Sequence, residues 1–475
     1  MRRHKIARAE TAAAPLVLAC ALLLASCHTI QSPPMPLDPV MSAMRVKART
    51  LDDPSIIDAL GKMGLSASAG WNLDALTVAA WNIRSDIAVA AADVAEGMAA
   101  ERVAGLKPNP TLNVDGSGFV TNNLGDPSPW VFAAGLGFTI ETHGKREIRV
   151  AQAQADTETR RWRLAETLWL ARSDLRKAIL ARNLALNSIA LAEEEIALRE
   201  NYLDFVQTQL RFGAGLGSDL LTAQTNLSRA QVQLRTARTE LATAEGLIAA
   251  AESIPIENLP LARLSPVSFE TLPAPEAIDP GTLRDFGLVN RLTVRHALAD
   301  YAVTEQALRA AVARQYPDYT IGPGYTFDRG DHALTFASNL IVPLIHDERD
   351  AIAQAVDVRA RAAAQFQVTQ TQALGEIDAA GARYRAAYAA FMESKTVEID
   401  AQATVSEVQR RLEAGGADRG EVLTAQINLA QDHRASLDAL RAATDALGAL
   451  EDGVQRPVWP ESTLAIQRPD GPSRE

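Results

Sequence analysis

An internal repeat constrains the fold of this chain more than any other feature. The tetrapeptide LTAQ occurs at residues 221–224 and again at residues 423–426, an offset of 202 positions. Gly213 and Gly415 follow the same offset. Self-similarity at a fixed offset indicates copies of one structural unit. The chain is therefore expected to contain two similar units in tandem.

Prolines mark the boundary between the two units. Six prolines lie between positions 255 and 280, and we place repeat 1 at residues 71–275 and repeat 2 at residues 276–460. Residues 27–70 are predicted to form an extended tether, because the prolines at 33, 34, 36 and 39 favour extended conformations. Residues 461–475 are expected to form a flexible tail.

Each unit is predicted to contain a helix, two strands, a long helix, a turn and a last helix. In repeat 1 the helices are expected near 74–106, 145–212 and 218–252. The first helix stops before KPNP at 107–110, because a residue that precedes proline is disfavoured in the α region. The two shorter helices together match the length of the long one. Stacked end to end beside it, they would form an elongated unit.

The long helix of repeat 1 carries two apolar seams at sevenfold spacing. Their members differ by two positions, about 200° around a helix, so the seams lie on opposite sides. Such a helix packs between two neighbours, as in a closed ring of helices. In repeat 2 one seam becomes polar at Glu393, Asp400 and Glu407, which either weakens the ring interpretation or marks a face turned to water. The seams of repeat 1 are Leu184, Leu191, Leu198, Phe205 and Phe212, and Ile189, Ile196, Leu203 and Leu210.

Between the helices the apolar period changes from seven to two. Residues 111–121, 130–141, 319–327 and 334–342 alternate large apolar side chains with small or polar ones. This alternation predicts β-strands with one apolar face. Each segment is about ten residues long, the length that a tilted strand needs to cross a bilayer. The aromatic residues expected in these membrane strands include Trp130, Phe138, Tyr325 and Phe336.

Four such strands would have two open edges. Unpaired backbone groups are not tolerated in lipid, and small bacterial barrels need roughly eight strands. The chain is therefore expected to self-associate, as a dimer with eight strands or a trimer with twelve. The alternative is a pair of soluble hairpins that cap a helical bundle.

The first 26 residues are predicted to be a lipoprotein signal peptide. Four Lys and Arg residues within the first eight positions precede a short apolar segment at 15–25. The segment ends in LASC, which is similar to a bacterial lipobox, so Cys27 is predicted to carry a covalent lipid. An ordinary signal peptide with an incidental cysteine is the alternative. His28 replaces the aspartate that favours inner-membrane retention in enterobacterial lipoproteins, so the outer membrane is the predicted location.

Composition and motifs argue against several function classes. The formal net charge of −11 disfavours binding to a nucleic acid backbone. The seven histidines are scattered, with no spacing typical of metal ligands. His143 and His346 occupy matching strand-to-helix junctions and are interpreted as interfacial polar residues. No nucleotide-binding loop or nucleophile motif is present. We expect no enzyme activity and no cofactor apart from the lipid on Cys27.

The repeated turn resembles that of the bacterial outer-membrane factor family, whose best-known member is TolC. The resemblance is carried by residues 211–224 and 411–426, in which a long helix, a glycine turn and an LTAQ-like restart follow one another. The segment GLKPNP at 105–110 is similar to that of heavy-metal efflux members related to CzcC. The resemblance implies a mainly α fold with membrane β-strands: a trimeric α-helical barrel that continues into a twelve-stranded transmembrane β-barrel. It also implies a periplasmic adaptor and an inner-membrane pump as partners.

The two glycine turns are then expected to be the periplasmic tips. Their simplest interpretation is helix-turn chemistry, in which glycine ends one helix and Ser218 or Asp219 caps the next. The functional hypothesis adds contacts with the adaptor and a ring of charge at a constriction, formed by Asp418 and Arg419. The predicted contact residues are Gly213, Leu216, Ser218, Asp219, Gly415, Ala417, Gly420 and Glu421.

The predicted function is the outer-membrane channel of a tripartite efflux system. Its cargo would be small solutes, either heavy-metal cations, as the CzcC-like segment favours, or drugs. Two alternatives remain open. One is the outer-membrane duct of a type I protein secretion system. The other is a non-transporting periplasmic coiled-coil lipoprotein that bridges envelope layers.

Overall fold

The computed structural model of the chain describes residues 38–66, 70–119, 128–265, 271–340 and 347–459. The predicted signal peptide, Cys27 and the tail at 461–475 lie outside the described residues. The chain divides into two units, Met1–Arg49 and Thr50–Glu475, each considered by itself.

Within the first unit, the described residues form the helix α2 (Pro39–Lys47). The second unit adds the helix α3 (Pro54–Lys62). Both helices lie within residues 27–70, so the expectation of an extended tether there is wrong at these two segments. Each helix has proline at its first position and an aspartate cap, and proline is well tolerated there because that N–H has no helical partner. Ile56 and Leu60 of α3 are buried, so this part of the predicted tether belongs to the core of Thr50–Glu475.

The order helix, strand, strand, long helix, helix occurs twice in Thr50–Glu475. Each long helix ends at a glycine turn, and each last helix runs back beside it. The first set is α5 (Ser85–Ala104), β1 (Thr111–Gly118), β2 (Trp130–Ile140), α6 (Lys145–Arg211) and α7 (Gly217–Ala251). The second is α9 (Leu292–Arg314), β3 (Tyr319–Asp328), β4 (Asp331–Leu340), α10 (Arg349–Glu413) and α11 (Arg419–Val454).

A short helix precedes each set, α4 (Leu73–Ile83) before α5 and α8 (Pro280–Asn290) before α9. The single helix expected at 74–106 is therefore wrong. It is broken at Arg84, whose backbone is extended with φ −65° and ψ 126°. Arg291 makes the equivalent break in the second set, with φ −53° and ψ 134°. Both arginines bind carboxylates of the adjacent long helix, Asp174 at 3.7 Å and Glu376 at 2.6 Å. These tertiary contacts explain breaks at positions without proline or glycine.

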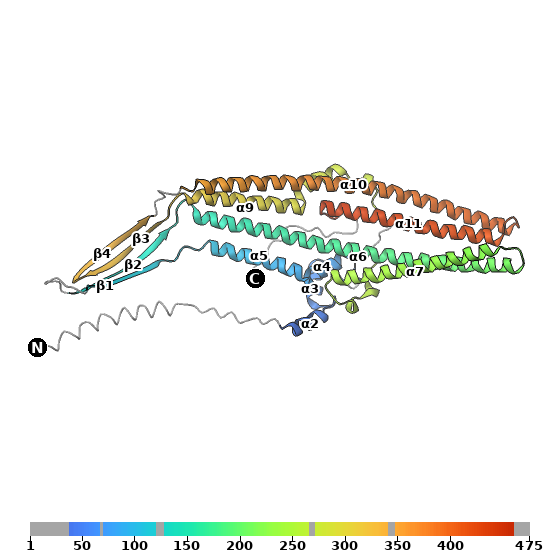
Figure 1. Cartoon of the computed structure of the whole chain (residues 1–475), viewed down its shortest axis with the longest axis horizontal. Helices are drawn as coiled ribbons and strands as arrows, with labels where there is room; N and C mark the ends of the chain where they lie inside the picture. Colours follow the sequence, from blue (N-terminus) through green and yellow to red (C-terminus); the bar gives the residue numbers. More distant parts are fainter. Residues whose placement is uncertain (1–37, 67–69, 120–127, 266–270, 341–346, 460–475) are drawn as a thin grey trace. The chain divides into compact units, whose positions relative to one another are not determined.

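The helices of Thr50–Glu475 lie side by side in one layer (Figure 1). α6 contacts α5 and α7 on one side and α9 and α11 on the other, and α10 packs against α9 and α11. In this order α5 and α7 form one edge of the layer, and α10 forms the other. No helix among the described residues is long and apolar enough to cross a membrane.

α6 and α7 pack through buried alanines at sevenfold spacing. Small side chains let two helix backbones approach closely. The predicted leucine seam is only partly buried within the chain, since Leu184 is buried, Leu191 and Leu198 are half-buried and Phe212 is exposed. The alanines are Ala178, Ala185 and Ala192 on α6 and Ala223, Ala230, Ala237 and Ala244 on α7.

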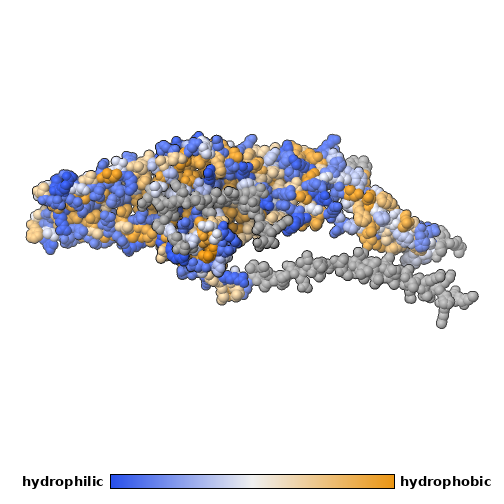
Figure 2. Space-filling model, turned by 180° about the vertical axis from the view of Figure 1, so that it is seen from behind, coloured by the Kyte–Doolittle hydropathy of each residue, from blue (hydrophilic) through white to orange (hydrophobic). Residues whose placement is uncertain are grey.

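The four strands form one antiparallel sheet in the order β1-β2-β3-β4. β2 pairs with β3, from Val131 opposite Asp328 to Ile140 opposite Tyr319, so the central pairing joins the two sets. β1 and β4 are the edge strands. Gly322 of β3 lies so close to the carbonyl of Leu136 that a β-carbon would collide with it. Figure 2 shows apolar residues gathered on the surface of the sheet.

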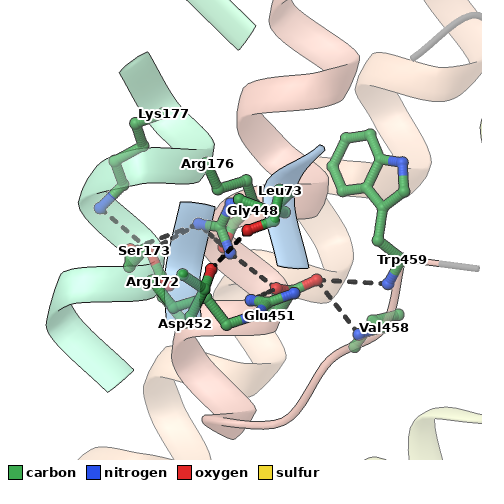
Figure 3. A network of polar contacts seen from close by, with 11 residues as sticks. Leu73, Arg172, Ser173, Arg176, Lys177, Gly448, Glu451, Asp452, Val458 and Trp459 are labelled. Carbon is green, nitrogen blue, oxygen red and sulfur yellow. Dashed lines mark hydrogen bonds and ion pairs between the residues drawn. The ribbon is translucent and has the colours of Figure 1, made fainter. Parts of the chain in front are cut away.

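A buried ionic cluster joins α6 to α11 near the middle of the helical layer (Figure 3). Arg172 and Arg176 of α6 both donate to Oε1 of Glu451, the second over 2.9 Å. Arg176 also reaches Asp452 over 2.9 Å. The other oxygen of Glu451 accepts the backbone N–H groups of Val458 and Trp459 over 3.1 and 3.2 Å. One carboxylate thus ties together the two sets and the segment that follows α11.

We predict that Glu451→Ala lowers the free energy of unfolding by about 3–5 kcal/mol, because it leaves the buried Arg172 without a counter-charge and Arg176 with Asp452 alone. Denaturant unfolding followed by tryptophan fluorescence measures the loss. The control is Glu193→Ala, which breaks an exposed pair with Arg238 and should cost less than about 1 kcal/mol. Equal losses in the two variants would contradict a structural role for the cluster.

Candidate functional site

The two turns between long and short helices have the same backbone geometry. Gly213 and Gly415 are left-handed, with φ 76° and 75°. After them, Ala214 donates to the carbonyl of Gln209 and Gly416 donates to the carbonyl of Arg411, over 2.9 and 2.8 Å. This arrangement satisfies carbonyls at the helix end and favours glycine, which has no β-carbon penalty in this conformation. The expected glycine ends of the long helices are thus observed.

The starts of the two returning helices differ. Asp418 caps α11, and its Oδ1 accepts the N–H of Glu421 over 2.8 Å. α7 begins at Gly217 after Leu216, which has no side-chain cap. The expectation that Ser218 or Asp219 caps α7 is wrong, because both residues already lie inside its first turn.

The surfaces of the two turns differ in chemistry. The α6–α7 turn is apolar: Phe212 is 83% exposed, Leu216 67% and Leu221 65%. The α10–α11 turn is polar, and Arg411 bridges the carbonyl of Gly416 and the carboxylate of Glu421 over 3.1 and 3.3 Å. An apolar turn can bind an apolar partner surface, whereas the polar turn stays compatible with water.

The remaining predicted residues divide between surface and interior. Ser218, Asp219, Asp418 and Arg419 are exposed, and Ala417 is half-buried. Gly420 is buried, and a β-carbon there would lie 2.5 Å from the ring of Phe205 on α6. Gly420 therefore serves the packing of α11 against α6 and presents no surface to a partner.

A groove of about 730 Å³ lies beside this contact, between α6, α10 and α11. Asp400, one of the residues that interrupt the apolar seam of repeat 2, lines it together with Asp418, Glu421 and Asp432. No group of three or more ligating side chains in the described part of the chain is arranged to hold a metal ion. The groove can therefore attract cations through a diffuse negative field, but its carboxylates do not form a coordination sphere.

The sheet exposes the aromatic residues that the sequence places in membrane strands. Trp130 is 63% exposed and Phe336 72%, and Phe138 and Tyr325 are also exposed. Exposed apolar area of this extent on a sheet indicates a surface that another apolar phase covers.

A polar junction joins the strands to the helices, and of its residues only His143 is predicted there from the sequence. Lys145, at the start of α6, donates to Asp318 over 2.9 Å and to the carbonyl of Tyr316 over 2.6 Å. His143 stacks on Tyr316 with ring centroids 3.4 Å apart. His346, its predicted counterpart, lies outside the described residues. The junction fixes β2 and α6 against α9 and β3.

Comparison with known proteins agrees with this architecture. Residues 77–251 match the family model described as outer membrane efflux protein. No curated protein matches the chain.

Several solved outer-membrane channels share the fold. CusC superimposes with a TM-score of 0.62 at 18% identity, over 80% of this chain and 91% of CusC. VceC of Vibrio cholerae gives 0.64 at 18% identity, over 80% and 95%. CmeC of Campylobacter jejuni gives 0.64 at 14% identity, over 80% and 85%. At these identities the likeness establishes that the chain has the fold of an outer-membrane channel protomer.

We predict that Gly420→Ala weakens the contact between α11 and α6, because the ring of Phe205 must move, at a cost of about 1–3 kcal/mol. Hydrogen exchange of residues 411–425 should accelerate. The matched control is Gly217→Ala at the start of α7, where a β-carbon meets nothing within 4 Å. If both variants exchange at the wild-type rate, Gly420 is not needed for this packing.

Proposed function

We propose that this chain is one protomer of an outer-membrane channel that exports small solutes in a tripartite efflux system. One observation carries the proposal: a sheet with an exposed apolar surface and two open edges is joined directly to a layer of very long helices. The family match over residues 77–251 and the fold shared with outer-membrane channels support the same function.

The open edges of the sheet favour assembly in the membrane. β1 and β4 each have a row of backbone groups without a strand partner among the described residues. Such groups cannot be left unpaired in lipid, so β4 of one copy would pair with β1 of the next. Three copies would supply the twelve strands that the resemblance to TolC-type channels implies. A homotrimer in contact with outer-membrane lipid is the assembly we propose.

The edges of the helical layer favour the same closure. Arg235 of α7 lies two positions before the buried Ala237, and therefore about 200° away from it, on the free face. Glu393 and Glu407 of α10 each lie two positions after a buried residue, on the free face of that helix. Arg235 would thus face Glu393 and Glu407 of α10 in the next copy, where Glu407 also pairs with Arg410 over 2.6 Å. This seam would account for two of the three acidic positions that interrupt the sevenfold pattern of repeat 2, while Asp400 lines the groove.

The turns would face the other components of the system. The exposed apolar residues Phe212, Leu216 and Leu221 suit an adaptor, through which an inner-membrane pump would connect. A lipid on Cys27 would add an anchor in the outer membrane. The segment at 105–110 and the acidic groove favour heavy-metal cations over drugs as cargo.

Pore formation and the aperture can be tested together in planar bilayers. The purified protein should migrate as a heat-modifiable trimer and conduct ions. Asp418→Asn removes the charge but retains an N-cap side chain, so any gain in conductance over wild type reports on charge and not on helix fraying. We expect Asp418→Asn with Arg419→Gln to raise conductance. Wild-type protein that stays monomeric and silent would contradict the channel itself, whereas unchanged conductance in the variant would contradict only the aperture.

The partner can be identified by photo-crosslinking in cells. A photoreactive amino acid at Leu216 or Ala417 should capture a periplasmic adaptor, identified by mass spectrometry. As a control, the photoreactive amino acid is placed at Val289 of α8, which is exposed but distant in sequence from both turns. Capture of an adaptor from a type I secretion system would favour the protein-export alternative. Capture of structural envelope proteins alone would favour the bridging lipoprotein.

A further inference from the structure

Each repeat contains a joint where two shorter helices meet end to end beside the long helix. In repeat 1, Arg84 at the start of α5 donates to the carbonyl of Ala251 at the end of α7, over 3.3 Å. In repeat 2, Thr293 at the start of α9 donates to the side chain of Gln455 at the end of α11, over 3.1 Å. The two joints occupy equivalent places and use different chemistry.

The backbone turns in the same way at both joints. Ser253 and Gln455, just beyond the ends of α7 and α11, have φ values of 54° and 53°. A buried carboxyl group lies beside each turn, Glu252 in the first joint and Glu451 in the second, and both residues are 0% exposed. Glu252 directly precedes Ser253 and Glu451 precedes Gln455 by four residues, so the two carboxyl groups lie beside the same turn without occupying equivalent positions.

The two carboxyl groups differ in their partners. Glu451 accepts from two arginines and two backbone N–H groups. Neither carboxyl oxygen of Glu252 has a hydrogen-bond partner among the described residues. A buried carboxylate without a partner is strongly disfavoured, because burial removes its hydration and nothing replaces it.

The charges around Glu252 do not neutralise it. Arg84 is the cation that attracts the carboxyl group of Glu252. Arg84, however, forms ion pairs with Asp86 over 2.7 Å and with Asp174 of α6 over 3.7 Å. Glu257, on the short helix that packs against the end of α7, is exposed and also acidic. Burial raises the pKa of Glu252 well above its ordinary value, and Arg84 offsets only part of this shift.

We propose that Glu252 is a proton-binding site that makes the α5–α7 joint sensitive to pH. With the proton bound, the carboxyl group is neutral, its burial costs less and the joint is closed. Loss of the proton leaves a buried negative charge that Arg84, already held by Asp86, does not neutralise. Water must reach this charge to stabilise it, so the end-to-end contact of α5 and α7 opens. The second joint lacks this response, because Glu451 already has its donors.

The sign of the effect follows from the direction of the shift. A carboxyl group whose pKa is raised on folding stabilises the folded state most below its unfolded pKa, and this stabilisation is lost as pH rises through the folded pKa. The joint is therefore closed in acid and opens in alkali. This inference does not depend on the proposed transport function.

Hydrogen–deuterium exchange of the full-length protein in detergent tests the proposal. Protection of residues 244–254 and 85–90 is measured between about pH 6 and about pH 9, with correction for intrinsic exchange. Wild type should lose up to about tenfold in protection for each pH unit between the ordinary pKa of a glutamate and the raised, folded pKa of Glu252, and the loss should level off above the folded pKa. Glu252→Gln should keep its protection throughout, because its side chain cannot ionise. The control Glu240→Gln, on the same helix and in an exposed pair with Arg441, should respond to pH as wild type does.

Two results would overturn the proposal: protection in wild type that does not change with pH, or the same pH response in Glu252→Gln and wild type. If Glu252→Gln does not fold, infrared spectroscopy of wild type decides the question. A carbonyl band of a protonated, buried carboxyl group at neutral pH supports the proposal, and its absence contradicts it.

Discussion

The buried cluster of Arg172, Arg176, Glu451 and Asp452 is the interaction on which the helical layer depends. It joins α6, which contacts helices of both repeats, to α11 at the end of the second repeat. Burying three charged groups, Arg172, Arg176 and Glu451, is costly, and apolar residues of similar volume often give equal stability. The convergence of both arginines on one carboxylate, however, fits one alignment of α6 with α11. The cluster therefore specifies register between the two halves more than it adds to their stability.

The two halves of Thr50–Glu475 contact each other at three places. β2 pairs with β3 in the sheet, the ionic cluster acts in the middle, and Phe205 packs on Gly420 near the turns. The same edges are left open at each level: β1 and β4 in the sheet, and α5 with α7 and α10 in the helices. A protomer that is closed at its centre and open at both edges is suited to assembly with copies of itself.

The two repeats share one backbone plan but have diverged in chemistry at equivalent positions. One turn exposes Phe212 and Leu216, and the other carries Arg411 and Glu421. One joint contains Glu252, which has no hydrogen-bond partner among the described residues, and the other contains Glu451 with four donors. The same order of elements frames both halves, and individual side chains make them chemically distinct.

The sequence by itself determined the long helices, the strands between them and the glycine turns, because each is specified by neighbours a few positions apart. A sevenfold apolar period predicts a helix, a twofold period predicts a strand, and glycine at the end of a helix predicts a left-handed turn. The tertiary structure alone decided that Arg84 breaks a helix and that Gly420 is buried under Phe205. It alone decided that Glu252 has no hydrogen-bond partner in the described part of the chain, whereas Arg172 meets Glu451, a residue 279 positions away. Such pairings depend on which faces of distant segments come together, and no local period in the chain encodes that choice.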